Sequence, residues 1–162
     1  DGAEYTGNYM EGKKEGYGEF KWADRSSYKG NFVNNNIEGK GKYTWADDRE
    51  FDGDWVHNKM HGYGVFTYSE GHVYKGDWVE DYQSGKGKMT YLPGTVVEES
   101  YEGDWEKGVK HGKGIYRYRA DEGTVYDGAF TYQGKATRKD GTMASSKLFA
   151  DSRYSRKSRE KL

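Results

Sequence analysis

Residues 101–114 read YEGDWEKGVKHGKG, and the spacing of their glycines and aromatic side chains recurs along most of the chain. Counted from Tyr101, a glycine follows after two residues and a tryptophan after four. Two more glycines follow after 11 and 13 residues, and bulky side chains come after 15 and 17, at Tyr116 and Tyr118. We interpret this stretch as one copy of an internal repeat.

The other copies are found by the aromatic residue that starts each of them. The starts are Tyr5, Tyr28, Phe51, Tyr74, Tyr101 and Tyr126. The first four starts are 23 residues apart and the next two intervals are 27 and 25 residues, so the loops before the fifth and sixth copies carry insertions. The sixth copy has Thr137 and Lys139 where the second-strand glycines belong, and the repeat therefore degenerates there.

Each copy is predicted to form one β-hairpin. Spacings of two residues indicate strands, because alternate side chains of a strand share one face. The seventh residue after each start is of a type that accepts a positive φ in a hairpin turn. These residues are Gly12, Asn35, Asn58, Asp81 and Gly108. The sequence thus predicts an all-β fold, a single-layer antiparallel solenoid of repeated hairpins, with aromatic residues and glycines on one face and polar residues on the other.

The composition agrees with a β protein built on aromatic residues. The 162 residues include 16 Tyr, 5 Trp, 6 Phe and 24 Gly but only one proline. There is no cysteine, which excludes disulfides and Cys-ligated zinc and favours a reducing compartment. Lysine and arginine number 26 against 27 aspartate and glutamate, so the net charge is only −1. No apolar run approaches the ~18 residues that a membrane helix needs.

The repeat resembles the MORN repeat family, and residues 101–114 are similar to its consensus at almost every position. The resemblance extends from Tyr5 to about Phe130, in five full copies. It implies a hairpin solenoid that serves as an interaction module. Members of the family include junction proteins that link membranes, plant phosphoinositide kinases, ciliary radial-spoke heads and cytoskeletal scaffolds of parasites.

A single-layer sheet has no second layer to cover its aromatic face, so we expect part of that face to form an open groove. Tryptophan and tyrosine dominate binding hot spots, which makes the groove a candidate site for a peptide or helix of a protein partner. The candidate residues are Tyr28, Phe32, Trp55, Tyr74, Trp78, Tyr101 and Trp105. Trp55, Trp78 and Trp105 occupy the same repeat position and should form one row.

The charges divide the chain into a repeat array, residues 1–132, and a basic segment, residues 133–162. The basic segment has nine Lys and Arg against three Asp and Glu, a net charge of +6, whereas the array has 17 against 24, a net charge of −7. We expect residues 143–150 either to form a short helix that covers the end of the array or to belong to a disordered tail. An uncovered edge would favour homodimers by strand pairing. Arg153, Arg156, Lys157 and Arg159 are the candidates for binding an anionic membrane.

No catalytic or metal-binding pattern is present. His61 and His111 share one repeat position, which indicates a structural role, and no histidine has a second ligand at zinc spacing. Nucleophile and phosphate-loop motifs are lacking, and the Gly-x-Gly pairs recur in every hairpin. We therefore expect no enzymatic activity in these residues, no cofactor and no nucleic-acid partner.

Three functions remain open: a scaffold that binds a protein, a module that binds phospholipid, and a regulatory domain of a larger enzyme. Gly2 lies three residues before Tyr5, as Gly71 lies before Tyr74, so we expect the chain to begin inside a longer array. We expect a cytoplasmic protein, with the cytoskeleton, the cilium or a membrane surface as places suggested by the resemblance.

Overall fold

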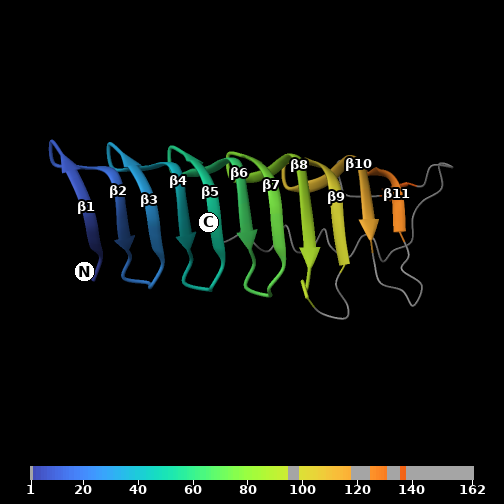
Figure 1. The fold of residues 1–162 in the computed structure, drawn as a ribbon, viewed down its shortest axis with the longest axis horizontal. Helices are drawn as coiled ribbons and strands as arrows, with labels where there is room; N and C mark the ends of the chain where they lie inside the picture. Colours follow the sequence, from blue (N-terminus) through green and yellow to red (C-terminus); the bar gives the residue numbers. More distant parts are fainter. Residues whose placement is uncertain (1, 95–98, 118–124, 131–135, 138–162) are drawn as a thin grey trace.

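The computed structural model describes residues 2–94, 99–117, 125–130 and 136–137, and their strands form a single antiparallel sheet. The strands lie side by side in sequence order from β1 to β12, so the array is elongated across the strands (Figure 1). The predicted all-β, single-layer fold is confirmed for these residues. The strands are β1 (Glu4–Met10), β2 (Lys13–Lys21), β3 (Ser27–Val33), β4 (Asn36–Thr44), β5 (Glu50–Val56), β6 (Lys59–Thr67), β7 (Val73–Val79), β8 (Tyr82–Tyr91), β9 (Glu99–Glu106), β10 (Val109–Arg117), β11 (Val125–Phe130) and β12 (Ala136–Thr137).

Each full repeat is one hairpin, closed by a tight turn at the predicted position. In the second repeat Asn34 and Asn35 have φ of 48° and 70°, and the corresponding pairs of the other four repeats also have positive φ. Two successive residues with positive φ are typical of a type I′ turn, whose twist matches that of the flanking strands. The residue types at the seventh position thus determine where each hairpin turns.

The turns also connect successive hairpins. The side-chain oxygen of Asn58 accepts a hydrogen bond from the backbone N–H of Ile37 at 2.7 Å. The backbone N–H of Asn58 donates to the Ile37 carbonyl at 3.0 Å. Asp81 makes the same two contacts with Met60, at 2.8 and 3.0 Å. These bonds cross from one repeat to the preceding one and satisfy backbone groups that the hairpins would otherwise leave unpaired.

The glycines of the repeat have two different roles. The first glycine of each second strand, such as Gly62 with φ of 63°, lies in a β-bulge, where the register between the two strands shifts. It is needed for its backbone conformation. The others, such as Gly76 and Gly87, pair across the strands, and a Cβ at either would overlap the Tyr74 ring or its hydroxyl. The bulge glycines therefore differ from the paired glycines, on which the rings pack.

The sixth repeat begins as the sequence indicates. Its first strand, β11, pairs with β10 in the register of the earlier repeats, with Gly114 opposite Gly128 and Tyr116 opposite Tyr126. The predicted covering helix at 143–150 lies outside the described residues, and so do Arg153, Arg156, Lys157 and Arg159.

Candidate functional site

The seven predicted groove residues form one interlocked row on the face that we call the inner face. Each of the three tryptophans in this row lies edge-on between the aromatic residues that start two successive repeats. The Trp78 ring centroid is 5.2 Å from those of both Phe51 and Tyr74, with interplanar angles of 78° and 86°. Trp55 lies in the same way between Tyr28 and Phe51, and Trp105 between Tyr74 and Tyr101. The prediction that the three tryptophans form a row is confirmed.

The three tryptophans and the Tyr28, Tyr74 and Tyr101 hydroxyls of this row form hydrogen bonds, and all seven side chains are buried. The indole N–H groups of Trp55 and Trp105 each donate to a glycine carbonyl of the preceding repeat at 3.0 Å. The Tyr74 hydroxyl donates to the Asp77 carbonyl at 3.1 Å, and burial raises the pKa of Tyr74 well above its ordinary value, so the hydroxyl stays a donor. The exposed fractions of the seven side chains lie between 0 and 5%. They hold the array together, and their contact with a partner stays a prediction.

Partly exposed aromatic rings lie on the same face in the first two repeats. Phe20, Trp22, Tyr43 and Trp45 are half-buried and follow one another at centroid distances of 4.5, 5.1 and 4.6 Å. In the third and fourth repeats the residues at these positions are buried, with 3 to 7% exposure. Accessible aromatic surface on the inner face therefore lies at the ends of β2 and β4, and also at β1, where Tyr9 packs edge-on against Tyr5 and is 60% exposed.

The sequence carried a signal for this surface that our prediction did not use. The rings occupy the last two bulky positions of each repeat, 15 and 17 residues after its start. They lie at the ends of the second strands, beyond the glycine pairs on which the starting aromatic residues pack. A candidate list drawn from the strand ends would have included them.

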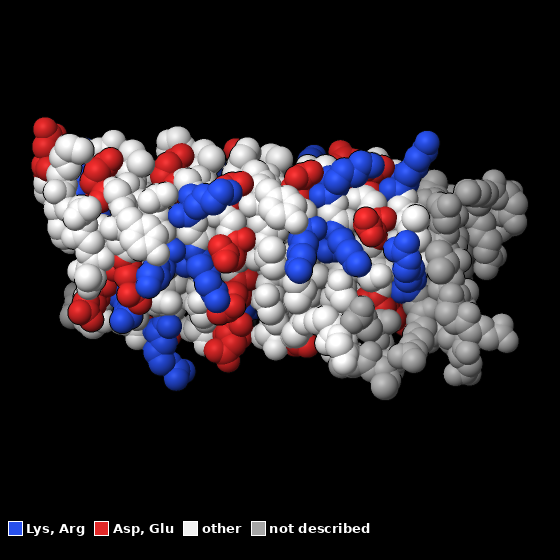
Figure 2. All heavy atoms as spheres, viewed as in Figure 1, with Lys and Arg blue, Asp and Glu red and all other residues white. Residues whose placement is uncertain are grey.

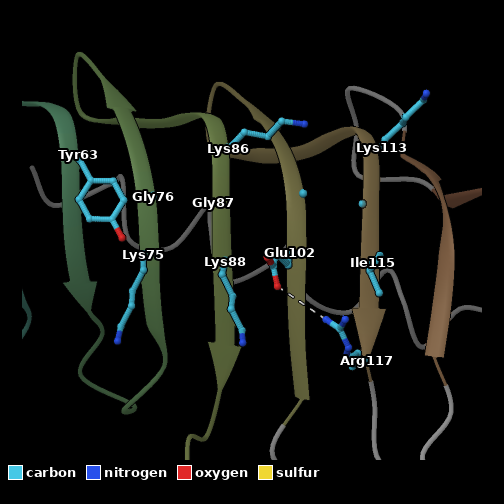
Figure 3. Close-up of a pocket in the computed structure, with 12 residues that line it drawn as sticks. Tyr63, Lys75, Gly76, Lys86, Gly87, Lys88, Glu102, Lys113, Ile115 and Arg117 are labelled. Atoms are coloured by element: carbon cyan, nitrogen blue, oxygen red, sulfur yellow. Dashed lines mark ion pairs between the residues drawn. The ribbon is translucent and has the colours of Figure 1, made fainter.

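The opposite face, which we call the outer face, carries the residues between the pattern positions. A shallow hollow of about 790 Å³ lies on it over β6 to β10 (Figure 3). The backbone of paired glycines forms its floor, and five basic side chains and the carboxylate of Glu102 are among the groups that surround it. The glycines are Gly76, Gly87, Gly103 and Gly114, and the basic residues are Lys75, Lys86, Lys88, Lys113 and Arg117.

The cations of the hollow are only partly neutralised. Lys86 forms an ion pair with Asp104, and the hydrogen bond from Lys86 lowers the pKa of that carboxyl. Arg117 lies 3.8 Å from Glu102. Lys75 and Lys88 lie directly opposite each other on β7 and β8, and neither forms an ion pair among the described residues. Tyr63, 55% exposed, stands at one end of the hollow.

A second basic group lies on the same face nearer the N-terminus. It consists of Lys29 and Lys42, directly opposite each other on β3 and β4, and of Lys40, which pairs with Asp54. Figure 2 shows the basic side chains gathered in separate groups on this face, with acidic side chains between them. The sequence prediction gave the array a net charge of −7 and overlooked that its cations are segregated.

The histidines lie at separate places in the described part of the chain. His72 is buried against Tyr91, with ring centroids 5.4 Å apart, and its Nδ1 accepts the Leu92 N–H at 3.1 Å. His111 Nε2 lies 3.4 Å from Glu106. In the part of the chain that the structure describes, no three His, Asp or Glu side chains lie close enough to hold a metal ion. None of the described segments is a helix of the length and apolar character needed to cross a membrane.

Comparison with known families agrees with the hairpin array. A family model described as the MORN repeat matches five times, at residues 5–27, 28–48, 51–73, 74–96 and 101–120. A search of curated proteins found no match. The five matches begin at the aromatic residues that start the five hairpins, and together they cover more than half of the sequence. The chain belongs to the MORN repeat family.

Proposed function

We propose that the array is a non-catalytic scaffold that binds a protein partner, a peptide or a helix, along the inner face. The observation that carries the proposal is the run of half-buried rings from Phe20 to Trp45. Contiguous apolar surface of this kind is typical of interaction sites, and tryptophan is the residue most enriched in binding hot spots.

The buried row supports this surface from behind. Tyr43 packs against both Tyr28 and Trp55, at centroid distances of 6.4 and 6.0 Å, and Trp45 packs against Phe66 at 5.4 Å. A ring held on several sides loses little conformational entropy when a partner binds. The residues predicted from the sequence would thus act by holding the binding rings in place.

The test compares a Trp22→Ala/Trp45→Ala variant with a control, Val56→Ala/Val79→Ala, whose side chains are exposed at the hairpin ends. Partners are captured by crosslinking, identified, purified and titrated against both variants. Loss of two aromatic hot spots should weaken binding about 10-fold or more, whereas the control should bind like the wild type. Equal affinity of the wild type and the tryptophan variant would contradict the proposal.

The competing function is binding of anionic phospholipid by the basic segment, through Arg153, Arg156, Lys157 and Arg159. The net charge of +6 in residues 133–162 favours it, since each cation near an anionic surface contributes ~1 kcal/mol. Flotation with vesicles that contain phosphatidylserine or phosphoinositides, at low and high salt, separates the two functions. Binding that is lost on removal of residues 133–162 would support lipid recognition, in keeping with a role at a membrane surface. Binding of a protein by residues 1–132 alone would support the scaffold, in the cytoplasm, cytoskeleton or cilium.

A further inference from the structure

We propose that the outer face binds an acidic protein segment at two equivalent basic clusters, so that one ligand with two blocks of carboxylates engages both. The first cluster is Tyr17, Lys29, Lys40 and Lys42, and the second is Tyr63, Lys75, Lys86 and Lys88. This surface is the reverse of the one in the proposed function, and neither inference depends on the other.

The two clusters correspond residue by residue. Every member of the second lies 46 residues, or two repeats, after its counterpart in the first. Both lysine pairs, Lys29 with Lys42 and Lys75 with Lys88, are direct cross-strand neighbours. Tyr17 and Tyr63 are 59% and 55% exposed and precede their lysine pairs by one strand. The sheet thus presents the same group of side chains twice.

The contacts that flank the clusters are repeated as well. Lys40 forms an ion pair with Asp54 on the strand that follows, as Lys86 does with Asp104. The remaining cations differ, since Lys42 lies 2.9 Å from Glu50 whereas Lys88 forms no ion pair among the described residues. The second cluster therefore has more cationic charge available, and we expect it to bind the ligand more strongly.

Folding accounts for the lysine pairs only in part. Lys29, Lys42 and Lys88 each lie opposite a carboxylate on their other neighbouring strand, whereas Lys75 lies opposite Val65. Like charges placed directly opposite each other destabilise an antiparallel sheet. The same outer positions in the third repeat are filled by Asp52 and Val65, which avoid the repulsion. Two lysines that face each other at a fixed interval, the second pair without an ion pair among the described residues, are suited to an anionic ligand.

The charges between the clusters identify the ligand. The outer positions of β5, the strand that separates the two clusters, are all acidic: Glu50, Asp52 and Asp54. Glu50 and Asp54 pair with Lys42 and Lys40 of the first cluster, and Asp52 lies opposite Lys42. A membrane surface or a nucleic-acid backbone carries negative charge continuously and would meet these carboxylates. An acidic peptide with a neutral spacer avoids them. The alternation of charge on this face therefore favours a protein segment.

The spacing of the clusters sets the length of that spacer. Lys29 and Lys75 are four strands apart, on β3 and β7, which corresponds to about 19 Å at 4.7–4.9 Å per strand. An extended chain covers roughly that distance with six residues. A ligand with two triplets of glutamate, joined by about six neutral residues, should reach both clusters.

The probe is a fluorescent synthetic peptide with two Glu-Glu-Glu blocks and a six-residue Gly-Ser spacer, measured by anisotropy against the full chain at 20 mM salt. A monovalent peptide has the second block replaced by glutamine. The bivalent peptide should bind at least 10-fold more tightly, because the second contact is intramolecular. Its affinity should fall several-fold at 150 mM salt, where exposed charges are screened.

Three charge-matched variants locate the binding. Lys75→Gln/Lys88→Gln should reduce the affinity for the bivalent peptide to that for the monovalent one. Lys29→Gln/Lys42→Gln should have a smaller effect in the same direction. The control Lys13→Gln/Lys59→Gln removes the same charge at the hairpin turns and should bind like the wild type. Circular dichroism establishes that each variant is folded.

Several results would overturn the proposal. The first is a bivalent peptide that binds no better than the monovalent one, and the second is an equal loss of affinity in all three variants, which would show a response to net charge alone. The third is cluster-dependent binding of phosphatidylserine vesicles without binding of the peptide, which would assign the face to a membrane. Failure of the Trp22→Ala/Trp45→Ala test leaves these measurements unaffected, so the two proposals are tested separately.

Discussion

The two faces of the sheet differ in how regularly they repeat. On the inner face the residue that starts a repeat is Tyr or Phe every time, and it packs on a glycine pair in the same way in each hairpin. On the outer face the position next to it holds Thr6, Lys29, Asp52, Lys75 and Glu102 in turn. One face is therefore fixed by the packing of the array, and the other is free to vary in charge.

This difference indicates where stability and specificity are located. Changes on the inner face should affect the free energy of unfolding, because each ring contacts its neighbours in two repeats. Changes on the outer face should leave folding almost unaffected and alter what the protein binds. The following predictions test that division, from the largest expected effect to the smallest.

Trp78→Ala should lower the free energy of unfolding by about 3–5 kcal/mol, as truncation of a large buried aromatic side chain does. The ring is 3% exposed and joins two repeats through Phe51 and Tyr74, so unfolding should also become less cooperative. Urea titration followed by circular dichroism measures both quantities. The control is Tyr63→Ala on the outer face, for which we expect a change within about 0.5 kcal/mol. Similar losses in the two variants would contradict the division between the faces.

Gly87→Ala should destabilise the array by about 1–3 kcal/mol through overpacking. An added Cβ would overlap the Tyr74 hydroxyl and ring, which lie against this glycine and its partner Gly76. Thermal unfolding measures the effect, and Lys88→Ala, the adjacent residue on the outer face, is the control. If Gly87→Ala melted at the wild-type temperature, the ring could not be held against the backbone as the structure shows.

The sequence was sufficient for the hairpins, their turns and the tryptophan row, because these depend on local spacing that recurs in every copy. It was insufficient for two features that depend on three-dimensional register. The bulge glycines share the spacing of the ring-packing glycines, and only the backbone conformation, such as φ of 63° at Gly62, separates them. The pairing of Lys75 with Lys88 requires knowing which residues of neighbouring strands lie opposite each other.

The spacing of residues in the sequence was also insufficient to predict which aromatic residues are exposed. Aromatic residues that recur in every repeat were predicted to be a binding surface, but recurrence in a solenoid is also what packing requires, and the seven residues are buried. The partly exposed Trp22 and Trp45 recur as aromatic residues too, so spacing alone did not separate them from the core. Exposure depends on what lies above a ring, which a strand pattern does not specify.

Asp81→Asn should stabilise the protein at pH 7 by about 0.5–1 kcal/mol, the range of one hydrogen-bond contribution. Asp81 accepts the Met60 N–H, as Asn35 and Asn58 accept the corresponding N–H groups of earlier repeats, and asparagine keeps that acceptor without a charge. Burial raises the pKa of Asp81, so the folded state disfavours its ionised form.

The pH dependence of this difference has a definite sign. Because the folded pKa of Asp81 lies above its unfolded value of 3.8, the group costs stability above its folded pKa, and the cost disappears as the pH falls toward 3.8. The advantage of Asp81→Asn should therefore be largest at neutral pH and shrink in acid. Urea titrations of both proteins between pH 4 and 7 measure it. An advantage that grew toward acid would show that Asp81 instead stabilises the fold as a carboxylate.

The smallest effect is expected from reversing one charge on the outer face. Lys75→Glu replaces the repulsion of Lys75 and Lys88 by a cross-strand attraction, which should stabilise the sheet by roughly 0.2–1 kcal/mol at low salt. Both side chains are exposed, so the gain should decline as salt screens them. Val65→Thr, a change on the neighbouring strand that adds no charge, controls for the substitution of an outer residue. Stabilisation of the fold together with loss of the acidic peptide would show that the lysine pair is maintained at a cost to folding. Destabilisation by Lys75→Glu would instead place Lys75 among the residues on which the array depends, and the division between the two faces would fail at this position.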